Sequence, residues 1–163
     1  MPHPSLAIAN EFLSRAFDAG HGLTHMQLQK LTYLAHGWSL GGGGGPLIEE
    51  MFEAWAFGPV VRKLYDSLKG HGSGNIGRFI RWGDDTPLNG DTQVDNAFTQ
   101  HNRIERDLLD YISATYGRFH AYQLSGLTHL DGTPWQKAYV AGQNRIISNE
   151  SIESYFMRLV QRS

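Results

Sequence analysis

The chain reads Leu23-Thr24-His25-Met26-Gln27-Leu28-Gln29-Lys30-Leu31-Thr32-Tyr33-Leu34-Ala35-His36-Gly37-Trp38, and no other stretch specifies its own structure so completely. Thr24 is a good N-cap, and Gln27 lies three residues later, where it completes a capping box. Leu23 and Leu28 have the spacing of a hydrophobic staple. Apolar residues then recur at intervals of three and four through Trp38, which predicts a helix with one buried stripe.

Turn residues separate this helix from the elements that follow. Five consecutive glycines, Gly41–Gly45, make further helix costly in backbone entropy. The aromatic-rich run Phe52–Phe57 favours a short strand. Gly58-Pro59 then predicts a new helix, because proline has a fixed φ and no N–H and therefore suits the first helical position. This helix is expected to end at Gly70.

Apolar periodicity and capping signals predict further helices on both sides of this region. They are expected at residues Ser5–Ala19, Asn102–Gly117, His120–Leu130, Thr133–Val140 and from Ser148 onward. Glycine, proline, aspartate and asparagine dominate residues 70–100, which predicts mainly loops there. The expected fold class is mainly α: a compact, single-domain helical bundle over residues 1–163, with room for a short β-hairpin between residues 50 and 95.

The composition is that of one folded domain. The 163 residues are 40% hydrophobic and 18% charged, which suits a packed core better than a disordered chain or a membrane span. The net charge is −2, so no global positive field favours nucleic acid or anionic lipid. There is no cysteine and no secretory signal in the opening Met-Pro-His-Pro-Ser, and we expect a cytoplasmic protein.

Eight histidines raise the question of a metal site. A zinc peptidase helix needs two histidines one turn apart on one helix, with a glutamate between them. The pair His21 and His25 is interrupted by Gly22 and has no such glutamate, and His120 and His129 do not have this spacing either. We therefore expect no metal and no cofactor.

Other catalytic motifs also fail. The glycine run Gly41–Gly45 lacks the Lys-Ser or Lys-Thr pair with which a phosphate-binding loop opens its helix. The acidic residues at 49–53 are expected to be hydrated surface groups. The sequence thus predicts no enzyme, and the alternative of an unfamiliar enzyme would require a polar pocket, for instance around His129 and Asp131.

Several blocks together resemble the Panacea (SocA-like) antitoxin domain family. The stretch Leu23–Trp38 is similar to the family's opening helix, and Glu53–Val61 is similar to its alanine-tryptophan step leading into glycine-proline-valine. Leu124–His129 and the pair Pro134-Trp135 resemble a third block. These blocks occur in the family's order, and with the flanking helices the resemblance covers residues 5–160.

The resemblance implies an antitoxin of a bacterial, phage or prophage toxin–antitoxin system. Such a protein neutralises a cognate protein toxin, encoded by the adjacent gene, by direct protein–protein binding, without a membrane. Two alternatives stay open, a proteolytic adaptor that delivers the toxin to a cytoplasmic protease and a DNA-binding autoregulator. Nucleic acid is disfavoured because the would-be recognition helix Thr24–Trp38 has one lysine and no arginine. A homo-oligomer is also open.

Aromatic residues and arginine dominate the energetic centres of protein interfaces. Such residues gather around the glycine-proline step, and we take five of them as the candidate toxin interface: Trp55, Phe57, Arg62, Tyr65 and Trp82. The competing interpretation is that Trp55 and Tyr65 fill the core, since a tryptophan in a small helical domain usually packs.

Overall fold

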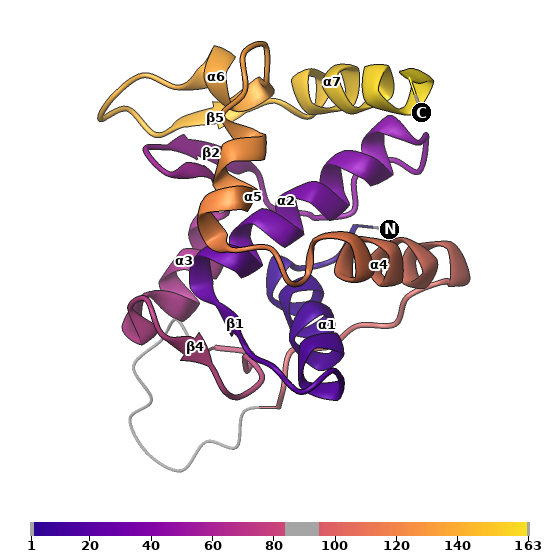
Figure 1. The fold of residues 1–163 in the computed structure, drawn as a ribbon, viewed down its shortest axis with the longest axis vertical. Coiled ribbons are helices and arrows are strands. Elements are labelled where there is room, and N and C mark those ends of the chain that lie inside the picture. Colours follow the sequence, from indigo (N-terminus) through magenta and orange to yellow (C-terminus); the bar gives the residue numbers. More distant parts are fainter. Residues whose placement is uncertain (1, 84–94, 163) are drawn as a thin grey trace.

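The computed structural model describes residues 2–83 and 95–162, and one helix, α2, crosses the middle of the molecule (Figure 1). Helix α2 spans His25–Gly41. The longest helices that pack against it are α1 (Ser5–Asp18), α4 (Arg103–Tyr116), α5 (Ala121–Thr128) and α7 (Asn149–Arg162). The shorter helices are α3 (Arg62–Leu68), the 3₁₀ turn η1 (Lys69–His71) and α6 (Pro134–Ala138). The predicted mainly α class is confirmed.

Two small antiparallel sheets complete the described part of the fold. The strands β2 (Phe52–Trp55), β3 (Gly58–Val60) and β5 (Arg145–Ile147) form one sheet in the order β3-β2-β5. The strands β1 (Leu23–Thr24) and β4 (Asn75–Ile76) form the other. The hairpin expected between residues 50 and 95 is therefore present as β2–β3. Strand β5 was not predicted from the sequence.

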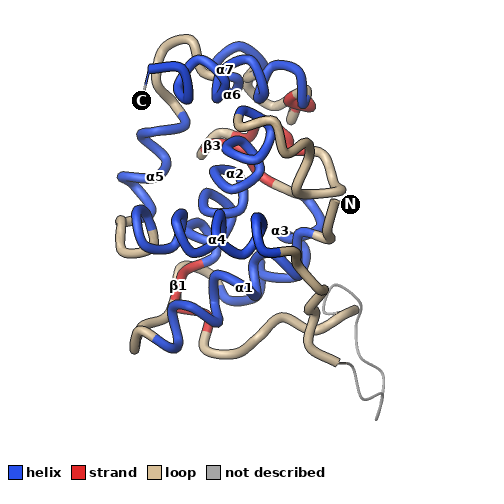
Figure 2. The backbone as a smooth tube through the Cα atoms, turned by 90° about the vertical axis from the view of Figure 1, so that its right-hand side faces the viewer, coloured by secondary structure: helices blue, strands red, loops and turns tan. Residues whose placement is uncertain are grey.

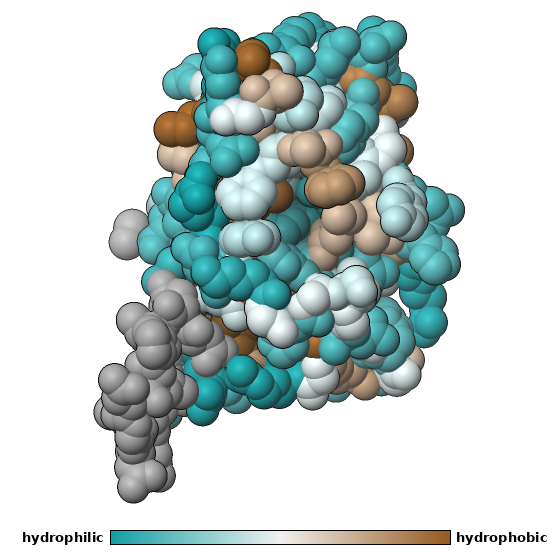
Figure 3. Space-filling view, turned by 90° about the vertical axis from the view of Figure 1, so that its left-hand side faces the viewer, coloured by the Kyte–Doolittle hydropathy of each residue, from teal (hydrophilic) through white to brown (hydrophobic). Residues whose placement is uncertain are grey.

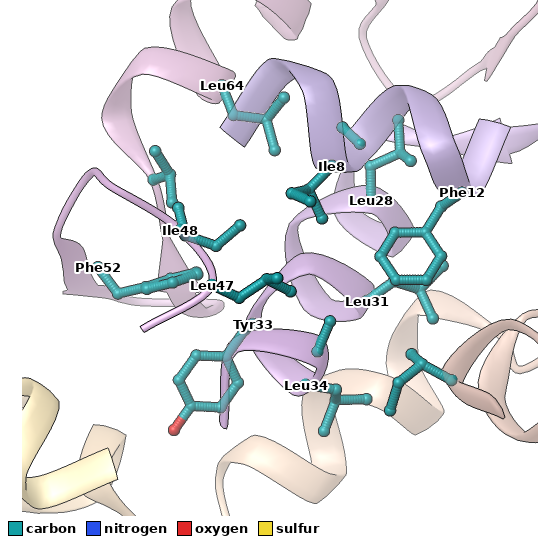
Figure 4. Close-up of a cluster of buried hydrophobic side chains, with 14 of the residues drawn as sticks. Ile8, Phe12, Leu28, Leu31, Tyr33, Leu34, Leu47, Ile48, Phe52 and Leu64 are labelled. Atoms are coloured by element: carbon teal, nitrogen blue, oxygen red, sulfur yellow. The ribbon is translucent and has the colours of Figure 1, made fainter. Parts of the chain in front are cut away.

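Helix α2 begins as its sequence specifies, but its surroundings differ from the prediction. Thr24 and Gln27 form the capping box, and the helix ends at Gly41, the first of the five glycines. Instead of one buried stripe, the helix is buried on all sides from Leu28 to Gly37. Helices α1, α3, α4, α5 and α7 all pack against it. Figure 4 shows part of the resulting core, in which Leu28, Leu31 and Leu34 of α2 lie close to apolar side chains of neighbouring elements.

A helix enclosed in this way must satisfy its buried polar side chains within the protein. His36 is fully buried, and its Nδ1 accepts hydrogen bonds from the backbone N–H groups of Ile48 (3.1 Å) and Leu47 (3.3 Å). The ring proton therefore lies on Nε2, which donates to Asn149 Oδ1 at 2.9 Å. Burial lowers the pKa of His36, so the neutral ring joins α2 to the loop before β2 and to the start of α7.

The prediction that Gly58-Pro59 opens a helix is wrong. These residues begin β3, and the following helix, α3, starts at Arg62 with Val61 as its N-cap. Among the described residues, strand β3 pairs with β2 alone and is an edge strand, with Ala54 opposite Pro59. Proline is tolerated on an edge strand because its missing N–H is not required by a second neighbour.

Helix α4 begins with a capping box and buries one side against the core. Asn102 and Glu105 cap each other, as the sequence indicates. The side chains of Leu109 and Ile112 are buried, whereas Ile104 is 79% exposed. Figure 2 shows α4 lying across α1, and the side of the helix that meets α1 and α2 is the one that is buried.

A buried asparagine organises the region predicted as loops. Asn10 of α1 accepts the N–H of Ile80 at 2.7 Å and donates to the carbonyls of Ile80 (2.7 Å) and Ala97 (2.8 Å). It thereby holds together the segments on either side of residues 84–94, which lie outside the described residues. Apart from η1, β4 and an isolated bridge between Arg81 and Asn96, the described residues from 70 to 100 form loops, as expected.

Two glycines on α2 make room for α7, and replacing one tests this packing. A Cβ at Gly37 would lie 2.2 Å from Phe156 Cε2, so Gly37→Ala overpacks the α2–α7 contact. We expect it to lower the free energy of unfolding by about 2 kcal/mol in urea titrations, despite alanine's higher helix propensity. Gly126→Ala on α5, where a Cβ meets nothing within 4 Å, is the control and is expected to be neutral or stabilising. Equal losses in both variants would contradict the packing.

Candidate protein-binding site

A pocket of about 390 Å³ opens where the first turn of α2 meets the β2–β3 turn, α3 and the start of α5. Figure 3 shows the face that carries the turn and α5, hollowed between apolar and weakly polar side chains. Its walls are mainly aromatic and apolar, and they include Met26, Trp55, Phe57, Tyr65 and Tyr122. These residues come from four elements that the fold brings together.

One wall is a small stack of interacting side chains. The rings of Trp55 and Tyr65 lie 4.8 Å apart, and the guanidinium of Arg62 lies 5.2 Å from the Trp55 ring centre. Arg62 also donates two hydrogen bonds to the carboxylate of Glu53, at 2.8 and 3.0 Å. These two hydrogen bonds hold the half-exposed Arg62 side chain beside an aromatic surface, where it remains available to a partner.

Two exposed aromatic side chains stand at the mouth of the pocket. Phe57 is 67% exposed because it lies in the two-residue turn between β2 and β3, and Tyr122 is 86% exposed in the first turn of α5. The turn is held in place by α5, since Ser125 Oγ donates to the Phe57 carbonyl at 3.1 Å. These side chains are therefore presented from a fixed backbone.

Lys30 of α2 forms the inner end of the pocket and is 1% exposed. Its ammonium donates to the carbonyl of Pro59 at 3.1 Å. Gly58, with φ of +117°, makes this approach possible, because a Cβ there would lie 2.8 Å from Lys30 Cε. The glycine-proline step thus brings the hairpin down onto α2.

The titratable groups of the pocket carry less charge than their types suggest. Burial lowers the pKa of Lys30 to about 7. The pKa of His25 is lowered to about 4, first by burial and then by the positive charges of Lys30 and His71. His25 is therefore neutral at physiological pH, and the pocket presents an apolar, weakly charged surface with Arg62 at its edge.

Four of the five predicted interface residues come together, and one does not. Trp55, Phe57 and Tyr65 line the pocket, and Arg62 packs on Trp55. Trp55 and Tyr65 are half-buried, so they are neither fully core nor fully exposed. Trp82 is absent from the pocket lining and packs partly buried against the core.

Most of the other pocket residues were not predicted, among them Met26, Lys30 and Tyr122. Met26 and Lys30 lie in α2, whose apolar periodicity predicts a buried stripe and gives no sign of a pocket. Tyr122 lies more than fifty residues from the hairpin, and only the packing of α5 on α2 and β3 brings it close. No local motif marks any of the three.

The residues named for an unfamiliar enzyme have structural contacts. The His129 ring lies between the carbonyls of Ser125 and Ala56, 3.3 Å from the latter, and 3.9 Å from the Trp135 ring centre. Asp131 accepts a hydrogen bond from Gln136. His129 therefore joins the end of α5 to the hairpin.

The acidic residues at 49–53 are also partly engaged. Glu50 accepts hydrogen bonds from the backbone N–H and the hydroxyl of Ser5, at the first residue of α1. Glu53 binds Arg62, as described above. Two of these carboxylates thus anchor other elements, in contrast to the expectation of a merely hydrated surface.

This fold and this pocket define a small, mainly helical domain with an aromatic and apolar pocket on one face. A family model for the SocA-like antitoxins, the Panacea domain, matches residues 28–136. Antitoxin SocA of Caulobacter vibrioides (strain NA1000 / CB15N) is 36% identical over 130 residues, which cover 79% of this chain and 66%, just under two thirds, of that relative. No solved structure matches.

The chain belongs to the SocA-like antitoxin family. The resemblance seen in the sequence is therefore confirmed. Among the described residues, no helix combines the length and the apolar character needed to cross a membrane.

The buried Lys30 predicts an unusual dependence of stability on pH. In the unfolded chain its pKa is near 10.5, whereas in the fold it is about 7, so between these values the unfolded state binds more protons. Stability should therefore rise with pH across this window, by at most about 1.4 kcal/mol per pH unit from this group. Urea unfolding at pH 7, 8 and 9 should show this rise, and Lys30→Met should reduce it. Parallel curves for both proteins would contradict a buried, titrating Lys30.

Proposed function

We propose that this protein is the antitoxin of a toxin–antitoxin pair and that it neutralises its toxin by direct binding through the pocket face. Membership of the antitoxin family is the observation that carries the first part of the proposal. The choice of face is supported by Phe57 and Tyr122, two large aromatic side chains that stand exposed beside an apolar pocket.

Aromatic groups in this position contribute binding energy efficiently. Covering them removes apolar surface from water, and their few rotatable bonds limit the entropy lost on binding. The β2–β3 turn is already held by Ser125 and α5 in the free protein, so little ordering has to accompany binding. Arg62 at the margin adds a charged group that is already oriented by Glu53.

Neutralisation then requires no chemistry from this chain. An interface of standard size covers roughly 800 Å² of each partner, enough to obstruct an active or substrate-binding site of a small toxin. The pocket would receive one protruding side chain of the toxin, and the surrounding residues would exclude water from that contact.

Co-expression with the product of the adjacent gene tests the proposal. We expect that gene to arrest growth when expressed alone, and co-expression to restore growth and yield a complex that co-purifies. Restored growth with rapid loss of the toxin would instead support the proteolytic adaptor. A non-toxic neighbour that forms no complex would overturn the proposal.

Substitutions at the pocket mouth test the contact surface. Phe57→Asp and Tyr122→Asp are each expected to weaken toxin binding on the order of 30-fold, because a carboxylate replaces an aromatic side chain that the toxin would cover. Ile104→Asp is the matched control, since Ile104 is 79% exposed on α4, away from the pocket lining. Affinities are measured by calorimetry on variants whose thermal unfolding matches the parent. Unchanged affinity in both pocket variants would exclude this face.

A further inference from the structure

Four ionisable side chains from distant parts of the sequence converge where the N-terminal segment meets α1 and the start of α4. Ligand atoms of His3, His101 and Glu105 all lie within 4.8 Å of one another. The carboxylate of Glu11, on α1, lies 3.1 Å from His101 Nε2. The group is well shielded, since the side chains of His3 and His101 are 8% and 3% exposed.

The backbone around these residues is fixed before any ligand arrives. The N–H of His3 donates to the Leu47 carbonyl at 2.7 Å, and its own carbonyl accepts from Glu49 at 2.9 Å, so the N-terminal segment is pinned beside residue 48. Glu105 is held by the capping box, in which its Oε1 accepts the N–H of Asn102 at 3.0 Å. This leaves Oε2 directed at His3.

The His3 ring is oriented as a metal-binding imidazole would be. Its Nδ1 lies 2.9 Å from Thr99 Oγ1, and its Nε2 lies 2.6 Å from Glu105 Oε2. Metal-bound histidines usually engage a hydrogen-bonding group through the nitrogen that does not bind the metal. Thr99 would play this part, and Nε2 would be the ligand atom.

His101 supplies an independent observation. Both of its ring nitrogens are buried, and neither has a partner in hydrogen-bond geometry within the described part of the chain. Nε2 lies 3.1 Å from the Glu11 carboxylate, close enough for an ion pair, so Nδ1 is the nitrogen that has no partner of any kind in this part of the structure. A buried imidazole left in this state is costly, and a metal ion bound to one of its nitrogens would satisfy it.

We propose that His3, His101 and Glu105 bind a Zn²⁺ ion, with Glu11 adjacent as a fourth ligand. Two imidazoles with one or two carboxylates suit Zn²⁺, whereas Mg²⁺ and Ca²⁺ prefer oxygen ligands alone. Zn²⁺ would lie between His3 Nε2 and Glu105 Oε2 in place of their hydrogen bond. Because its ligands come from the N-terminal segment, α1 and α4, the ion would clamp these three parts together independently of any toxin.

The test uses the full chain, purified without a polyhistidine tag, treated with chelator and exchanged into metal-free buffer. Calorimetric titration with ZnCl₂ is expected to give one site with a dissociation constant in the micromolar range or below, together with a rise in thermal midpoint. MgCl₂ should produce neither. Absence of Zn²⁺ binding by the parent protein would overturn the proposal.

Variants locate the site. His101→Gln and Glu105→Gln are each expected to weaken Zn²⁺ binding at least tenfold, and glutamine at 105 keeps the capping box so that α4 still forms. His71→Gln, which changes a histidine outside the cluster, should bind as the parent does. Retention of parental affinity by Glu105→Gln, the variant that preserves the fold, would overturn the assignment even if His101→Gln fails to fold.

Discussion

The fold depends on burying α2 on all sides while satisfying the polar groups it carries inward. Gln29 receives the N–H of Val61 and donates to the carbonyl of the same residue, at 2.9 and 3.2 Å. Lys30 donates to the carbonyl of Pro59, and His36 joins the segment before β2 to α7. Each of these side chains specifies the position of a different segment, which apolar contact alone would leave less defined.

The same constraint builds the candidate binding face. Gln29 and Lys30 bind neighbouring backbone groups at the junction of β3 and α3, and so they fix the hairpin against α2. The turn that follows from this placement carries Phe57 outward, and α5 secures it from the other side. The pocket is therefore a consequence of how the core is tied together, and its aromatic walls are attached to a rigid support.

Local signals in the sequence predicted the helices well, because capping boxes such as Thr24–Gln27 and Asn102–Glu105 act within one turn. They failed where the outcome depends on distant partners. Gly58-Pro59 suits a helix start and an edge strand equally, and pairing with β2 decides between them. Four of the five interface candidates gather because they are close in sequence, whereas Tyr122 joins them only through packing. The cluster of His3, His101 and Glu105 could not be predicted from motif spacing, because about a hundred residues separate His3 from the other two.

Hydrogen–deuterium exchange on the purified toxin complex tests most directly whether the pocket face is the contact surface. In the free protein, the amides of the turn at 56–57 and of the first turn of α5 should exchange quickly, because these positions lack helical hydrogen-bond partners. We predict that the complex slows exchange at both segments, while exposed amides at the start of α4 are unaffected. Slowed exchange at α4 or α7 with no change at the turn would contradict this account.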